Sequence, residues 1–144
     1  MPSKIAKVAT EAHGSMSVSH HQAAVLMART TVEAVAKAQG ITQGSLVVKI
    51  DELYNRHLVY EHVRDAAHEV RFVGNDAAHG DLVDKPINED EAQAILDLMD
   101  MVLDGVFIAP AKTAAQKAAR QAKKAAAATG TATSTPTAAS TATP

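Results

Sequence analysis

Apolar residues recur at helical spacing over four stretches of the chain. In residues 20–39 the apolar positions are three or four residues apart, at Val25, Ala28, Val32 and Val35. This spacing places them on one face of an α-helix. The same period predicts helices over 45–56, over 57–80 and over 88–109. We therefore predict an all-α fold, a bundle of four main helices in a domain of residues 19–110.

Turn and cap residues mark where these helices begin and end. Residues 1–18 form an N-terminal segment, whose short helix we expect to end at His13-Gly14-Ser15. We expect caps at Ser17 or Ser19, at Ser45, and at Asn88, where Glu91 three residues later completes a capping box. We expect Gly80 to end the third helix and Pro110 the fourth.

Composition narrows the fold class and the chemistry. Aromatic residues make up 3% of the chain and there is no Trp, so the core has to be built from Ala, Val, Leu, Ile and Met. The chain has no Cys, which excludes disulfides and cysteine-ligated zinc. We predict no metal site and no cofactor. No apolar run has the roughly 18 residues of a membrane span, and the N-terminus lacks a signal-peptide core, so we expect a cytoplasmic protein without membrane contact.

Charge divides the chain in two. Residues 1–110 hold nine Lys and Arg against sixteen Asp and Glu, a net charge of −7. Residues 111–144 hold five basic residues and no acid, first in an Ala/Lys-rich and then in a Thr/Ala/Pro-rich stretch. We predict a flexible basic tail with a nascent helix over 111–128 and disorder over 129–144. Its Lys117, Arg120, Lys123 and Lys124 are candidate nucleic-acid contacts; the alternative is that the tail only aids solubility.

Three polar residues stand out in the third predicted helix. Arg71, Asn75 and His79 are four residues apart and would share one helix face. His can act as acid or base near neutral pH, and Arg can bind a phosphate with its guanidinium fork. The row is therefore a candidate site for RNA cleavage, with Asn75 orienting His79 or the phosphate. The alternative is a structural row that holds helices together.

Four other residues are candidates for supporting roles. Arg64 lies on the same flank of the third helix as Arg71, and both could contact a phosphate. Gly74 would let a partner helix approach closely. Arg29 and Glu33 are four residues apart, and we expect an ion pair that braces the bundle.

Two sequence motifs carry a family resemblance. They are Met27-Ala28-Arg29-Thr30-Thr31-Val32-Glu33 and Arg71-Phe72-Val73-Gly74-Asn75-Asp76-Ala77-Ala78-His79. With the acidic helix start at 88–92 and Pro110, they resemble the domain-of-unknown-function 4145 family over residues 20–110. That family is similar to the HEPN group of small helical bundles, which are often dimeric and occur in toxins and defence systems of bacteria and phages. Active HEPN members are metal-independent endoribonucleases with an Arg-x(4–6)-His motif at the dimer interface.

The resemblance also implies a difference from active HEPN proteins. When Asn75 and His79 are aligned with the HEPN motif, the position of the catalytic Arg falls on Gly74, and Arg71 lies outside the usual spacing. The resemblance thus implies a homodimeric HEPN-like module of a conflict or defence system that binds RNA or a protein partner with weak or no ribonuclease activity. The alternatives are an active ribonuclease using Arg71 and His79, and a purely structural protein-interaction domain.

Overall fold

The computed structural model describes residues 1–70 and 85–130, and within them the regular elements are all helical. The prediction of an all-α fold is therefore confirmed for this part of the chain. The helices are α1 (Ser3–Ser17), α2 (His21–Ala38), α3 (Leu46–Asn55), α4 (Glu61–Glu69), α6 (Glu89–Leu103), a π-helical turn η1 (Asp104–Ile108) and α7 (Ala109–Gly130). None of these helices combines the length and the hydrophobicity that crossing a membrane requires.

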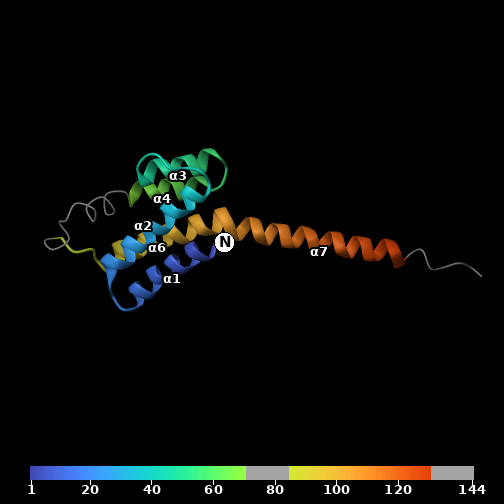
Figure 1. The fold of residues 1–144 in the computed structure, drawn as a ribbon, viewed down its shortest axis with the longest axis horizontal. Helices are drawn as coiled ribbons and strands as arrows, with labels where there is room; N and C mark the ends of the chain where they lie inside the picture. The colour runs from blue at the N-terminus through green and yellow to red at the C-terminus, as the bar shows by residue number, and fades with distance from the viewer. Residues whose placement is uncertain (71–84, 131–144) are drawn as a thin grey trace, which may run out of the picture. The chain divides into compact units, whose positions relative to one another are not determined.

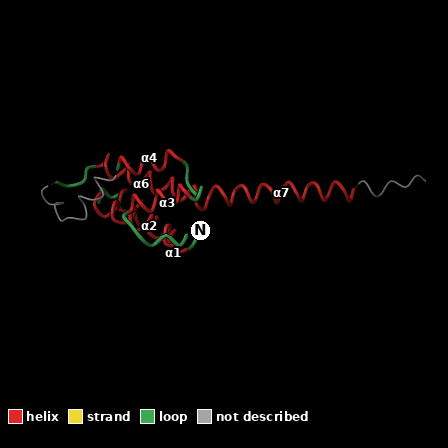
Figure 2. Tube along the Cα trace, turned by 90° about the horizontal axis from the view of Figure 1, so that it is seen from above, coloured by secondary structure: helices red, strands yellow, loops and turns green. Residues whose placement is uncertain are grey.

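The chain divides into two units, residues 1–110 and residues 111–144. In the first unit α2 and α6 pack against each other at the centre, and α1 packs along both of them. The α3–α4 pair lies on the opposite side, where α3 contacts α2 and α4 contacts α6 (Figures 1 and 2). The segment 1–18 thus contributes a packed helix, with Ile5, Ala9 and Ala12 buried.

The core is formed by the apolar positions that the periodicity identified. Val25, Ala28, Val32 and Val35 of α2 are all buried. Seven apolar residues of α6 are also buried, namely Ala92, Ile95, Leu96, Leu98, Met99, Val102 and Leu103. Leu26, the residue after Val25 on α2, is 59% exposed. Most core side chains are small or β-branched, which allows neighbouring helices to approach closely.

Helices α1, α2 and α3 end in the same hydrogen-bonded motif. After α3 the His57 N–H donates to the Tyr54 carbonyl and the Leu58 N–H donates to the Leu53 carbonyl, the pattern of a Schellman cap. The equivalent residues with positive φ are Ser19 after α1 and Gly40 after α2. The predicted end of the first helix at residues 13–15 is therefore wrong, since α1 runs through Gly14 to Ser17.

The helix starts agree with the sequence at two of three places. The Ser45 hydroxyl accepts a hydrogen bond from the Val48 N–H, and Asn88 and Glu91 form the complete capping box. The predicted cap of α2 at Ser17 or Ser19 is wrong, because His20 is the N-cap residue of α2 and its side chain makes no cap hydrogen bond. Ser19 cannot act as the cap since it is already the left-handed residue that ends α1.

Pro110 does not end the helical path. Helix α6 leads into η1, and α7 begins at Ala109 with Pro110 in its first turn, where a missing N–H breaks no helical bond. The proline ring would clash with the carbonyl four residues earlier in a regular α-helix. The wider π-helical turn contains that residue, Val106, and the Ala109 N–H donates five residues back to the Asp104 carbonyl.

Residues 111–128, expected to hold only a nascent helix, and residues 129–130, expected to be disordered, belong to α7. Figure 2 shows α7 as one unbroken helix. No residue of α7 is buried, so its helicity does not depend on a packed face. Half of its 22 residues are alanine, the residue with the highest helix propensity.

Candidate functional site

The described structure stops just before the predicted polar row. Helix α4 ends at Glu69, with Val70 as its C-cap. The predicted site residues that lie outside the described part of the chain are Arg71, Gly74, Asn75 and His79. The predictions that the helix continues to residue 80 and that this row shares one face concern the same residues. Their roles stay predictions.

Arg64, on α4, is held in place by three neighbours. Its guanidinium Nη2 donates to Glu61 Oε1 at 3.1 Å and to Asp65 Oδ1 at 3.3 Å. The guanidinium carbon lies 4.4 Å from the centroid of the Tyr54 ring, a cation–π contact. Desolvation lowers the pKa of Arg64, but the hydrogen bond to Asp65 and the nearby negative charges outweigh it and raise this pKa above its usual value. Arg64 is a fixed cation that two carboxylates already partly neutralise.

Two histidines join helices through carboxylates. His68 Nε2 of α4 lies 2.9 Å from Asp51 Oδ1 of α3, and His13 Nε2 of α1 lies 2.9 Å from Asp100 Oδ1 of α6. All four side chains are at least one-third exposed. His68 belongs to the predicted polar flank of the third helix, together with Arg64. In its described part this flank is therefore engaged by acidic residues.

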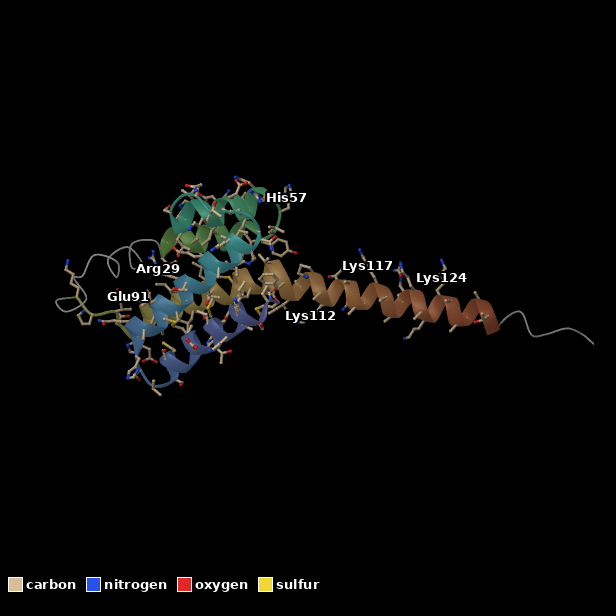
Figure 3. The ribbon with its side chains drawn as sticks, viewed as in Figure 1. Arg29, His57, Glu91, Lys112, Lys117 and Lys124 are labelled. Carbon is tan, nitrogen blue, oxygen red and sulfur yellow. The ribbon has the colours of Figure 1, made fainter. Side chains whose placement is uncertain are left out.

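The predicted ion pair of α2 does not form. Arg29 is half-buried on α2 (Figure 3) and Glu33 is exposed. Both belong to the described residues, and none of the ion pairs found there joins them. The two histidine–carboxylate pairs, in contrast, do join helices of the first unit.

Helix α7 separates positive charge from alanine around its circumference. At 3.6 residues per turn its basic side chains fall within an arc of about 140°, and they are Lys112, Lys117, Arg120, Lys123 and Lys124. Lys117 and Lys124 project on the same side of the helix, and Lys112 marks the other edge of the arc (Figure 3). Between residues 111 and 126 the opposite arc holds alanine, with Gln121 at its edge. The four predicted nucleic-acid contacts of the tail thus belong to one cationic face.

The sequence reading missed a hollow in the first unit. It lies between the start of α4 and the end of α6 and is lined by Tyr60, His62, Asp100 and Asp104, among others. The available signals were a tyrosine near the start of the third predicted helix and two aspartates four residues apart. Within the described residues no group of three or more His, Cys, Asp or Glu side chains could hold a metal ion.

Comparison with known protein families decides the assignment. The family model described as "Domain of unknown function (DUF4145)" matches residues 10–127. The chain belongs to the DUF4145 family. The match is longer than the expected resemblance over 20–110, so the DUF4145 region includes the second half of α1 and most of α7. No curated protein and no solved structure matches the chain.

The extent of the DUF4145 match changes how the basic segment is interpreted. All five cations of α7 lie inside the matched region, which ends at Ala127. The cationic helix is therefore part of the family region and not an addition after it.

Proposed function

We propose that this DUF4145 protein is a HEPN-like, homodimeric module that binds RNA through the cationic face of α7 and does not cleave it, within a bacterial or phage conflict system. The observation that carries the proposal is the separation of charge on α7. Five cations share one face of an exposed helix, and no acidic residue lies between Ala109 and Gly130. The all-α fold class and the family resemblance support the other parts of the proposal: a HEPN-like homodimer, a conflict system and the absence of cleavage.

The dimensions of this face suit a phosphate backbone. Lys112 and Lys124 are twelve residues apart, which is about 18 Å along a helix. Several successive phosphates of a single strand can be contacted over that distance. Each contact releases a bound counterion, so log K should fall with log salt by about 0.7 per phosphate contacted.

The remainder of the chain offers RNA a less favourable surface. Residues 1–110 carry a net charge of −7, and Arg64 is bound to Glu61 and Asp65. These carboxylates would repel a phosphate that approached Arg64. We therefore assign the main RNA contact to α7, with Arg64 and Arg71 at most secondary.

The absence of cleavage follows from the sequence resemblance. Gly74 occupies the position of the HEPN catalytic Arg and has no side chain with which to bind phosphate. Arg71 is one turn earlier and has a different spacing to His79. Asn75 and His79 then serve the conformation or binding of the module.

RNA binding is tested by charge-matched variants of the full chain. In one, Lys117, Arg120 and Lys124 of α7 are changed to Gln; in the control, Lys4, Lys7 and Lys37 of α1 and α2 are changed to Gln. Fluorescence anisotropy with labelled oligouridine is measured as a function of salt. In the α7 variant the slope of log K against log salt should become less steep by about 2. In the control the slope should be unchanged. Equal losses in both variants, or no binding by the parent chain, would overturn the proposal.

Cleavage is tested by incubating the chain with total RNA and tRNA without metal, beside Arg71→Ala and His79→Ala. We expect intact RNA in all three samples. Cleavage by the parent chain that both substitutions abolish would establish the active ribonuclease instead. Homodimerisation is tested separately by sedimentation equilibrium, and a monomer at every concentration would remove that part of the proposal.

A further inference from the structure

A hollow between α4 and α6 is a candidate site distinct from the face of α7. It has a volume of about 300 Å³ and lies entirely within residues 1–110. The segment before α4 and the start of that helix contribute Tyr60 and His62, and the end of α6 and η1 contribute Asp100 and Asp104. One wall is therefore aromatic and the other acidic.

The aromatic wall is fixed and open. Tyr60 is 72% exposed, the highest value among the large hydrophobic residues of the described part. Its ring stacks on that of His62, with centroids 5.8 Å apart and planes at 17°. This stacking supports one face of Tyr60 and leaves the other face to solvent. The open face carries the negative part of the ring quadrupole, which attracts cations.

The acidic wall consists of two carboxylates one helical turn apart. Asp100 Oδ1 accepts a hydrogen bond from His13 Nε2 at 2.9 Å, which orients the Asp100 carboxylate. Asp104 is exposed, and its carboxylate makes no hydrogen bond or ion pair within the described residues. Among the described residues that line the hollow there is no Lys or Arg. Such a wall repels phosphates and carboxylates and attracts positive charge.

The position of this wall depends on the π-helical turn. Gly105, beside Asp104, comes so close to the segment before α4 that a Cβ atom there would lie 2.9 Å from the Leu58 carbonyl oxygen. The glycine thus allows the acidic turn to approach the segment that carries Tyr60. π-Helical turns occur frequently at functional sites.

The same chain already binds a guanidinium with these components. Arg64 lies 4.4 Å from the centroid of Tyr54 and donates to the carboxylates of Glu61 and Asp65. The hollow repeats that combination of tyrosine and two carboxylates, without a cation of its own. We infer that it binds a guanidinium group, presented as an arginine side chain by a partner polypeptide. A planar guanidinium can lie over the Tyr60 ring while its N–H groups reach Asp104, which an ammonium group cannot do equally well. This site is separate from the RNA-binding face proposed for α7.

The test is an NMR titration of the ¹⁵N-labelled full chain with Nα-acetyl-arginine amide. Saturable shifts should appear at the backbone amides of Tyr60, His62 and Gly105, and Nα-acetyl-lysine amide should bind about threefold more weakly. Tyr60→Leu keeps apolar bulk without the aromatic ring, and Asp104→Asn removes a charge. Each should weaken binding about threefold.

The matched control is Asp97→Asn. This residue is on α6, the helix that leads into the turn carrying Asp104, and lies outside the hollow, where its carboxylate accepts a hydrogen bond from Gln93 at 2.8 Å. Its substitution changes the net charge as Asp104→Asn does, and binding should be unaltered. The inference is overturned by equal weakening in both Asn variants, by absence of shifts at the hollow, or by equal binding of the lysine compound. It is also overturned if adenosine monophosphate binds there in place of the cation.

Discussion

Replacing Gly105 with alanine should not stabilise the first unit and should destabilise it by up to about 2 kcal/mol, although alanine is the better helix former. At Gly105 an added Cβ would lie 2.9 Å from the Leu58 carbonyl oxygen and 3.3 Å from Val59 Cγ1. The Leu58 oxygen belongs to the backbone and cannot swing aside as a side chain would. The alanine can fit only if η1 moves away from residues 58–59.

A second glycine isolates this steric effect from helix propensity. Gly14 lies inside α1, and a Cβ there would meet no atom within 4 Å. Gly14→Ala should therefore raise the free energy of unfolding by about 1 kcal/mol. Gly105→Ala gains a similar amount from propensity but loses about 1–3 kcal/mol to overpacking. The propensity gain cancels in the comparison, so Gly105→Ala should be less stable than Gly14→Ala by about 1–3 kcal/mol.

The difference is measured by urea unfolding of both variants, followed by tyrosine fluorescence and by far-UV circular dichroism. Tyr54 and Tyr60 belong to the first unit, so the fluorescence does not report on α7. In thermal unfolding of the same two variants, at about 4 °C per kcal/mol for a unit of this size, the melting temperatures should differ by about 4–12 °C. If Gly105→Ala is as stable as Gly14→Ala, the close approach does not require glycine and the reasoning fails.

Three further predictions use the same unfolding measurements. Leu53→Ala, at a fully buried position, should cost about 2–5 kcal/mol, whereas Leu26→Ala, at a residue 59% exposed, should change stability by less than about 0.5 kcal/mol; similar costs would contradict the described core. Asn88→Ala should lower the free energy of unfolding by about 1 kcal/mol because α6 loses its capping box. Asn88→Asp should retain most of that stability; equal losses in the two variants would show that the cap is not the cause. His57→Gly should stabilise by about 1 kcal/mol, since His57 has φ of 60°, and a loss would show that its side chain makes a more important contact.

The helices could be predicted where a local signal is sufficient. Apolar spacing located α2, α3 and α6, and the side chains of Ser45 and Asn88 gave two of their starts. Local signals failed at residues that can either end a helix or be accommodated within one. Gly14 remains inside α1 because a single glycine costs only about 1 kcal/mol. Pro110 remains in the helical path because the π-helical turn before it removes the clash.

The site residues divide in a similar way. The charge of the basic segment is evident from sequence, and its arrangement on one helix face follows as soon as α7 is helical. The partners of Arg64 could also be predicted from the sequence, since Glu61 and Asp65 are its neighbours on α4. The absence of an Arg29–Glu33 pair was not predictable, because correct helical spacing permits an ion pair without requiring one.

The sequence by itself determined the helical class, the apolar faces and the division of charge, because each depends on residues a few positions apart. Only the tertiary structure decided that His13 meets Asp100 and that Tyr60 and His62 face Asp100 and Asp104. These pairs are separated by about forty residues or more in the chain, and they meet because α4 and α1 both pack against α6. Contacts of that kind depend on packing angles and on the close approach at Gly105, which periodicity does not encode.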